Sequence, residues 1–450
     1  MKHSWFKTVF PIAAIFSFRM LGLFLLIPVF SIYAENLRSA TPALVGLALG
    51  VYGLAQGILQ MPFGMLSDKV GRKPMIAVGL CLFALGSLLG ALTDSIYGMI
   101  IARALQGTGA IGSVLIALLA DLTPDEQRTK AMAVIGMTIG TSFSLAMVIS
   151  PAISHHFGLA GIFYLTTLLA IAGIILLYLV IPKPVNQHFH VDSETNPVLL
   201  KQVVSNPQLQ RLNVGIFCQH FILTATFFAI PFILKKQAEQ GHLSQQWHFY
   251  LPLMIISFIL MIPFIILAEK KKRMKSVFLS SVFVMAMAQF LLAYAFQNWI
   301  ALCFLMLIYF VVFNILEAAL PSLVSKQANP NSKGTAMGVY STSQFLGLFI
   351  GGALSGVLYQ WSSSQGIFIT NAVLGIIWLL ISLSMKPNIS FSTLILPSPW
   401  PEKNEQIITQ LLKIKGVIEV AFAEDEQVIY LRVDRERYLW GSAEKVIDHG

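Results

Sequence analysis

Long apolar segments alternate with short polar ones along most of the chain. A membrane-spanning helix needs about 20 apolar residues to cross the hydrocarbon core of a bilayer. The segments divide into two groups of six, separated by the polar residues 183–211. This pattern predicts a polytopic α-helical membrane protein with twelve transmembrane helices, built from an N-terminal half (1–182), a linker (183–211) and a C-terminal half (212–386). The predicted spans are 9–33, 43–65, 74–93, 96–119, 131–154, 161–182, 212–235, 248–268, 276–296, 299–323, 335–358 and 366–385.

The pattern changes after Lys386, where short alternating runs replace the long apolar segments. The order of these runs predicts a β-α-β-β-α unit over residues 387–450, similar to a ferredoxin-like fold. About 60 residues can form only a small core. We expect this α+β domain to have a regulatory or an interaction role. At the cytoplasmic face of the membrane part, its acidic turn Glu424–Glu426 would meet the basic loop 270–275. The expected strands are 391–396, 417–422 and 428–433, and the expected helices are 402–415 and 435–447.

Composition supports a membrane protein, since 56% of the residues are hydrophobic and only 11% are charged. A soluble domain has about 25% charged residues. The net charge of +9 does not indicate a nucleic-acid partner, because the basic residues are spread over short connections. Seventeen Lys and Arg lie in connections on one predicted side and three (Arg38, Lys235 and Lys236) on the other. Since cytoplasmic loops are enriched in Lys and Arg, both termini are expected in the cytoplasm.

A charged loop follows the second predicted span, with the sequence Gly-Met-Leu-Ser-Asp-Lys-Val-Gly-Arg-Lys over residues 64–73. It resembles the signature G-x-x-x-D-R-x-G-R-K of the major facilitator superfamily, with a Lys in place of the first Arg. The resemblance implies an alternating-access transporter for a small-molecule substrate. We expect Arg72 to pair with Asp121 at the end of the fourth span, and Asp68 to face Gly334 and Thr335. The predicted gate residues are Gly64, Asp68, Lys69, Gly71, Arg72, Lys73 and Asp121.

Several polar and charged residues interrupt the predicted spans. Placing a cation in a membrane costs about 2.5–3.5 kcal/mol on insertion scales, so such residues are paired or functional. Arg103 and Gln106 lie in a segment that resembles the family's R-x-x-Q-G-x-G pattern, and this resemblance implies a role for Arg103 in proton coupling. Two interpretations stay open for the others: a proton or substrate site, or buried structural pairing, which is the commoner state of an interior histidine such as His220. The candidate cavity residues are Arg19, Arg103, Gln106, His220, Asn314 and Glu317.

The sequence shows no nucleotide-binding loop, no nucleophile–base constellation and no Cys or His cluster. We therefore expect neither an enzyme nor a metal site nor a cofactor, and no drive by ATP. Residues 333–347 and the C-terminal unit resemble a bacterial inner-membrane subfamily with an appended domain, which implies proton-driven efflux by a monomer embedded in the lipid bilayer. Only Pro151 of the family's antiporter signature G-P-x-x-G-G is kept. The alternative is a membrane sensor that signals through its C-terminal domain.

Overall fold

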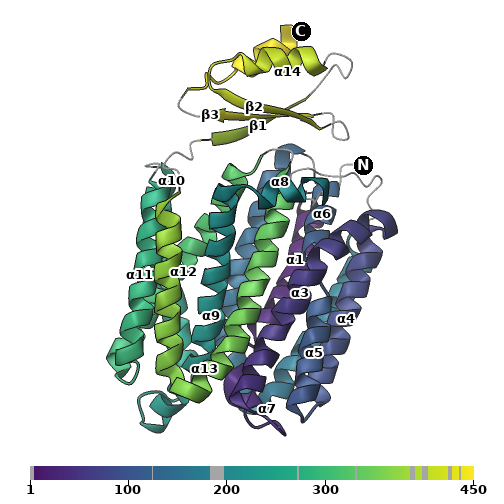
Figure 1. The fold of residues 1–450 in the computed structure, drawn as a ribbon. Coiled ribbons are helices and arrows are strands. Elements are labelled where there is room, and N and C mark those ends of the chain that lie inside the picture. The colour runs from purple at the N-terminus through teal and green to yellow at the C-terminus, as the bar shows by residue number, and fades with distance from the viewer. Residues whose placement is uncertain are drawn as a thin grey trace.

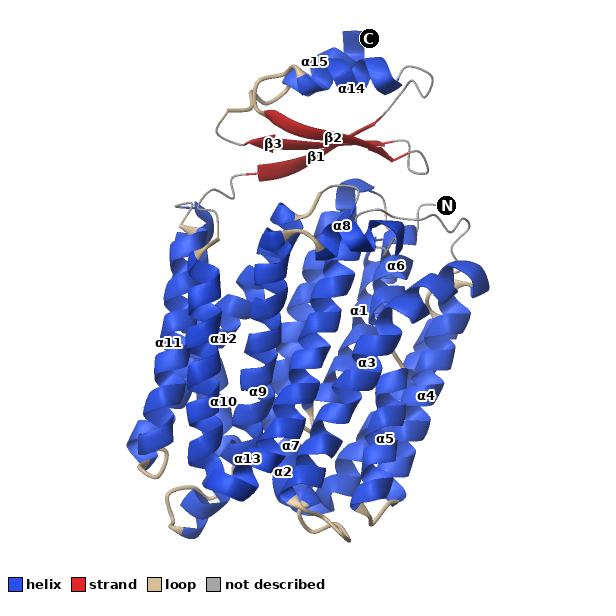
Figure 2. Cartoon of the chain, in the orientation of Figure 1, coloured by secondary structure: helices blue, strands red, loops and turns tan. Residues whose placement is uncertain are grey.

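The structure is a computed structural model with a helical bundle and a small α+β domain at one end of it (Figure 1, Figure 2). We call the end of the bundle that faces this domain the domain end, and the opposite end the far end. Nine helices in the described part of the chain are long and apolar enough to cross a membrane. The described residues are 5–123, 125–182, 197–270, 273–329, 332–385, 391–397, 404–423, 428–434 and 437–449.

The N-terminal half departs from the expected helices at two breaks. The first predicted span divides into two helices around Pro28, whose ring has no N–H to donate to a helical hydrogen bond. The fourth divides at residues 109–111, directly after Gly107 and Thr108. The helices are α1 (Trp5–Phe24), α2 (Phe30–Ala34), α3 (Pro42–Val70), α4 (Arg72–Leu92), α5 (Ile96–Thr108), α6 (Gly112–Asp121) and α7 (Asp125–Leu179).

The long helices α7 and α13 each contain two of the expected spans. Gly158 interrupts α7 with φ +63°, and Ser362 and Ser363 interrupt α13. The arrangement agrees with the predicted order of segments, and the count of twelve spans stays a prediction. The predicted linker contains η1 (Pro197–Leu199), α8 (Leu200–Val204) and the start of α9 (Pro207–Glu239). The C-terminal half continues with α10 (Trp247–Lys270), α11 (Met274–Ala295), α12 (Trp299–Gln327) and α13 (Lys333–Leu383).

The C-terminal domain has the expected order of elements, β1 (Phe391–Pro397), α14 (Asn404–Leu412), β2 (Val417–Ala423), β3 (Val428–Asp434) and α15 (Ser442–His449). Its antiparallel sheet has the order β1-β3-β2. Side chains alternate along a strand, so Ile429, Leu431 and Val433 pack with residues of α14 and α15, whereas Arg432 points toward the bundle. The predicted contact between the acidic turn and the basic loop lies outside the described residues, because neither 424–427 nor 271–272 is described.

The two halves of the bundle meet closely near the far end, where α3 packs against α13. A Cβ atom added to Gly46 would lie 2.8 Å from the backbone nitrogen of Gly356, and one added to Gly53 would lie 2.6 Å from the oxygen of Phe345. Only glycine permits backbones to approach this closely. The glycine stripe of α3 therefore forms a tight junction between the halves. An ion pair of 3.5 Å between Glu35 and Lys235 joins them at the same end.

Candidate gate and transport cavity

The signature loop is organised around the buried guanidinium of Arg72. Its Nε donates to Asp121 Oδ2 at 3.2 Å, and its Nη1 donates to Ser67 Oγ at 2.7 Å and to Asp68 Oδ1. The side chains of Arg72 and Asp121 are 2% and 0% exposed. The expected pair between Arg72 and Asp121 is thus present and joins the start of α4 to the end of α6.

The other signature residues shape the turn between α3 and α4. Gly71 has φ +107° and ends α3, a backbone conformation that favours glycine. Lys73 Nζ donates to the carbonyl of Ile181 at 2.6 Å, which ties the start of α4 to the segment after α7. A Cβ on Gly64 would lie 3.3 Å from Ser113 Oγ, so Gly64 permits the close approach of α3 and α6. Lys69 is exposed.

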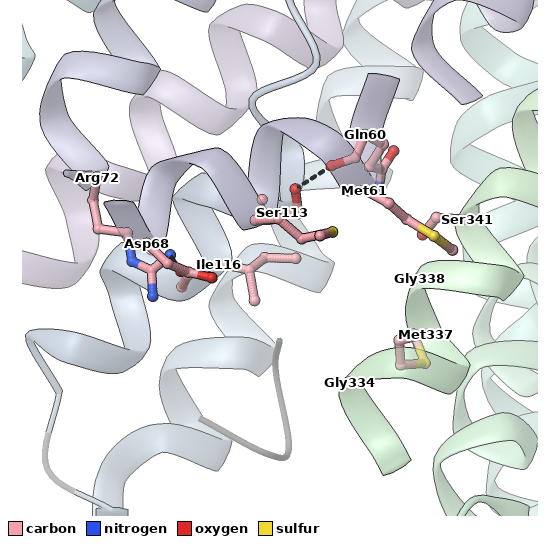
Figure 3. A pocket seen from close by; sticks show the side chains of 13 residues that line it. Gln60, Met61, Asp68, Arg72, Ser113, Ile116, Gly334, Met337, Gly338 and Ser341 are labelled. Atoms are coloured by element: carbon pink, nitrogen blue, oxygen red, sulfur yellow. Dashed lines mark hydrogen bonds and ion pairs between the residues drawn. The ribbon is translucent and has the colours of Figure 1, made fainter. Parts of the chain in front are cut away.

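A cavity lies between the halves at the domain end, and we call it the mouth cavity. Figure 3 shows Asp68 and Arg72 on one side of it and Gly334 and Met337 of α13 on the other. Asp68 therefore lines the same cavity as the start of α13, and its ion pair is with Arg72. The expected approach of Asp68 to Gly334 and Thr335 stays a prediction. The cavity is lined by Gln60, Met61, Gly64, Met65, Asp68, Arg72, Ser113, Ile116, Ala117, Gly334, Met337, Gly338 and Ser341.

Arg103 belongs to a buried polar chain inside the N-terminal half. Its Nη1 donates to Gln106 Oε1 at 2.7 Å, and Gln106 Nε2 donates to Ser87 Oγ at 2.7 Å. The guanidinium carbon lies 4.7 Å from the centre of the Tyr52 ring, a cation–π contact. The structure therefore brings Arg103 and Gln106 together, with Ser87 and Tyr52 as additional partners.

A second polar cluster, centred on Glu317, lies in the C-terminal half. Gln219 Nε2 donates to Glu317 Oε2 at 2.8 Å, and His220 Nε2 lies 3.8 Å from the same oxygen. His220 Nδ1 lies 3.3 Å from the carbonyl of Ile216, and its Nε2 lies 2.7 Å from Gln344 Nε2. Since a carbonyl can only accept, the geometry assigns a hydrogen to Nδ1 and lets Nε2 accept from Gln344.

This cluster is near the surface where the halves meet. The ring of Phe313, one turn before Glu317 on α12, stacks on Phe143 of α7 with centroids 5.7 Å apart. His220 lies 6.3 Å from the same ring. The side chain of Glu317 is 32% exposed, whereas that of His220 is 4% exposed. Of the two ionisable members of the cluster, Glu317 is therefore the one with exposed surface that a solute can reach.

The two remaining candidates are separate from these clusters. Asn314 Nδ2 donates to Ser257 Oγ at 3.2 Å and joins α12 to α10. Arg19 is 2% exposed and lies beside Gly112 at the break between α5 and α6. The sequence analysis did not single out Gln219 and Gln344; both are amides inside predicted spans, which is the signal that could have identified them. No group of three metal-ligating residues occurs within the part of the chain that the structure describes.

The signature loop, the two packed halves of the helical bundle and the buried polar clusters are features of a transporter of the major facilitator class. The sequence profile of the Major Facilitator Superfamily matches residues 12–352 and 214–417. The chain belongs to this superfamily, and its relatives are transporters and not enzymes.

Similarity to one of the relatives extends over nearly the whole chain. The chain is 42% identical to the inner membrane transport protein YajR of Escherichia coli K12 over 431 residues, which cover 95% of this chain and 94% of that protein. It is 25% identical to the multidrug resistance protein MdtH of Aeromonas salmonicida, covering 77% of this chain and 86% of that protein. These relatives support a multi-pass protein of the bacterial inner membrane and favour a transporter over a sensor.

Solved structures support the same fold at low sequence identity. The xylose transporter XylE of E. coli matches with a TM-score of 0.67 and 14% identity, over 84% of this chain and 96% of that chain. A bacterial homologue of the human lysosomal transporter Spinster matches with a TM-score of 0.66 and 13% identity, over 83% and 95%.

Proposed function

We propose that the protein exports small molecules from the cytoplasm in exchange for protons, by alternating access. The observation that carries this proposal is the position of Glu317. Its carboxylate is partly exposed inside the C-terminal half, and its Oε2 lies 3.8 Å from His220 Nε2. Ionisable residues within membrane helices commonly serve as proton relays. Resistance proteins among the relatives, MdtH and the quinolone resistance protein NorA of Staphylococcus aureus (27% identical over 208 residues, 45% of this chain and 51% of that protein), support efflux as the direction.

Glu317 would exchange its proton for the solute. When ionised, the carboxylate accepts a hydrogen bond from Gln219 and could attract a positively charged part of a solute. When protonated, it loses that charge, and the solute is released. His220 is assigned as neutral by its two hydrogen-bond partners, so it can accept a proton only by giving up the bond from Gln344. In this proposal Glu317 carries the proton, and His220 positions the carboxylate of Glu317.

The conformation suits one half of an alternating-access cycle. The far end is closed by the junction of α3 and α13 and by the Glu35–Lys235 pair, and the mouth cavity is open at the domain end. With the domain end in the cytoplasm, as the distribution of basic residues predicts, this is the inward-facing state. Closure of the mouth would bring Asp68 to the N-terminus of α13 and favour the outward-facing state, because an anion is stabilised at that end of a helix.

Transport by purified protein in proteoliposomes tests the coupling. A fluorescent quinolone is a suitable first solute, in view of the relative named for quinolone resistance. We expect an imposed pH gradient to drive its accumulation by the parent protein, and Glu317→Gln to lose this accumulation while it still binds the quinolone. Asp94→Asn is a matched control, because that carboxylate is 75% exposed in a loop at the far end. Gradient-driven transport that is unchanged in Glu317→Gln would remove Glu317 from the mechanism.

A further inference from the structure

Arg19 is a buried cation for which the described residues supply no counter-ion. Arg19 is 2% exposed, and both its Nε and its Nη2 lack a hydrogen-bond partner among those residues. The Nε of Arg103 also lacks a hydrogen-bond partner among those residues, but its guanidinium donates to Gln106 and faces the Tyr52 ring, contacts that Arg19 does not have there. Leaving a buried charge uncompensated is strongly destabilising, so a membrane protein keeps such a residue when something else compensates it.

The guanidinium lies against the start of a helix. A Cβ added to Gly112, the first residue of α6, would lie 3.4 Å from Arg19 Nη1 and 3.9 Å from its Cζ. The absence of a side chain at this position leaves room beside the guanidinium. Arg19 of α1 therefore points at the break that separates α5 from α6.

The break also leaves donors at the N-terminus of α6. The N–H groups of Ala110 and Ile111 are used in tight turns, to Thr108 O at 2.8 Å and Gly109 O at 2.9 Å. The first bond within the helix is from Leu115 N–H to Ile111 O at 2.9 Å. For the N–H groups of residues 112–114, no acceptor is recorded among the described residues, and no side chain caps the helix.

The cation and the helix start reinforce each other electrostatically. The N-terminus of a helix carries roughly half a positive charge and presents N–H donors to an anion. Interrupted helices inside transporters use such N-termini to hold anionic substrate groups. Ser113, in the same turn, lines the mouth cavity, so the first turn of α6 borders open space at the domain end.

We propose that Arg19 and the N-terminus of α6 form a binding site for one small monovalent anion of the carboxylate class. A planar carboxylate matches the fork of the guanidinium and can accept from the helix amides as well. The anion is either a carboxylate of the transported solute or a free anion that neutralises Arg19. The assignment to a solute rests on the proposed export function; the existence of the site does not.

Binding can be measured without a gradient, on the full-length protein in detergent. The probes are sodium benzoate and sodium chloride, each titrated against sodium isethionate at constant ionic strength, with thermal unfolding as the readout. A ligand at ten times its dissociation constant lowers the unfolding equilibrium constant about elevenfold. We expect benzoate to raise the unfolding midpoint of the parent protein and to leave that of Arg19→Gln unchanged.

Controls separate the site from general salt effects. Arg38→Gln removes an arginine whose side chain is 79% exposed, and it should respond to benzoate as the parent does. Arg19→Lys keeps the charge but loses the fork, so its dissociation constant for benzoate should rise about tenfold. If Arg19→Gln does not fold, the dissociation constant of Arg19→Lys alone shows whether benzoate binds at Arg19.

The outcomes distinguish the sources of the anion. A larger effect of benzoate than of chloride supports a carboxylate ligand, and competition between benzoate and the quinolone then assigns that carboxylate to the solute. An equal effect of benzoate and chloride overturns the carboxylate class. The site does not exist if the parent shows no shift, if Arg19→Gln shifts as the parent does, or if Arg19→Lys binds benzoate as tightly as the parent. None of these results depends on proton coupling, which the Glu317→Gln experiment tests separately.

Discussion

At the scale of single residues, two arginine–aspartate pairs of the same length have different environments. The pair between Arg72 and Asp121 is 3.2 Å long with side chains 2% and 0% exposed. The pair between Arg38 and Asp94 is also 3.2 Å long, but its side chains are 79% and 75% exposed. Solvent and salt weaken an exposed pair, whereas a buried pair cannot lose one partner without leaving the other charge in a medium that does not solvate it.

Substitution of the two aspartates should therefore have unequal effects. We expect Asp121→Asn to lower the free energy of unfolding by about 3 kcal/mol, because Arg72 stays buried with less compensation. Asp94→Asn should lower it by less than about 1 kcal/mol. Denaturant unfolding in mild detergent measures both values, and equal losses in the two variants would show that burial does not determine the strength of the gate pair.

At the scale of elements, the junction of α3 and α13 determines whether the far end is closed. A Cβ on Gly50 would meet the carbonyl oxygen of Phe349, and one on Gly352 would lie 2.8 Å from the backbone nitrogen of Gly50. Protein interiors do not absorb such overlaps without movement of the backbone. The two helices must move apart if either position carries a larger side chain.

We expect Gly50→Val to open the far end and to shift the carrier toward the outward-facing state. Spin labels at Arg38 and Glu239, which are exposed residues of the two halves at the far end, would report a longer distance. Gly136→Val is the matched control, since a Cβ at Gly136 has no atom within 4 Å. A distance distribution in Gly50→Val like that of the parent and of Gly136→Val would show that the junction does not hold the far end closed.

At the scale of the whole molecule, one arginine links the C-terminal domain to the bundle. Arg432 of β3 donates through Nη2 to the carbonyls of Lys326 and Gln327, at 3.2 and 3.4 Å, and through Nη1 to Asn329 at 3.4 Å. These carbonyls belong to the last turn of α12, which leaves its final C=O groups without helical partners. Burial lowers the pKa of Arg432 from its ordinary value, and Glu419 opposes that shift. The domain thus caps the helix that directly precedes α13.

Removal of this cap should loosen the end of α12. Charged hydrogen bonds contribute about 1.5–3 kcal/mol, so Arg432→Ala should accelerate amide hydrogen exchange in residues 323–329 by about tenfold or more. Lys445→Ala, an exposed position of α15, should leave these rates unchanged. If the two variants exchange alike, the domain does not stabilise the bundle through Arg432.

The orientation of the molecule in the membrane is open to a direct test. In a cysteine-free background, we expect a cysteine at Arg38 to react with an impermeant maleimide added to intact cells and one at Lys130 to be protected. Both positions are exposed in the structure, so burial would not explain a difference. We expect this labelling because Lys and Arg are in excess in the connections at the domain end, and such connections stay in the cytoplasm. Labelling of Lys130→Cys from outside would reverse the predicted topology and the direction of transport.

The sequence by itself determined the membrane class, the two groups of apolar segments, the β-α-β-β-α domain and the pair of Arg72 with Asp121. These features depend on local composition and on a motif whose spacing constrains its geometry, so they can be read without knowledge of distant contacts. The strands of the C-terminal domain could also be predicted, since apolar and polar residues alternate along them as buried and exposed side chains do in a strand.

Only the tertiary structure decided which helices touch and which polar groups meet. The approach of Gly46 to Gly356, of Gln344 to His220 and of Arg19 to Gly112 joins residues that are far apart in the chain. In a membrane helix nearly every position is apolar, so periodicity does not show which face packs against a neighbour. The break between α5 and α6 was likewise not apparent, because a glycine in a membrane helix is compatible with a continuous helix as well as with an interruption. The packing around each glycine decides whether the helix continues or is interrupted. Here the helix is interrupted, and the start of α6 faces Arg19.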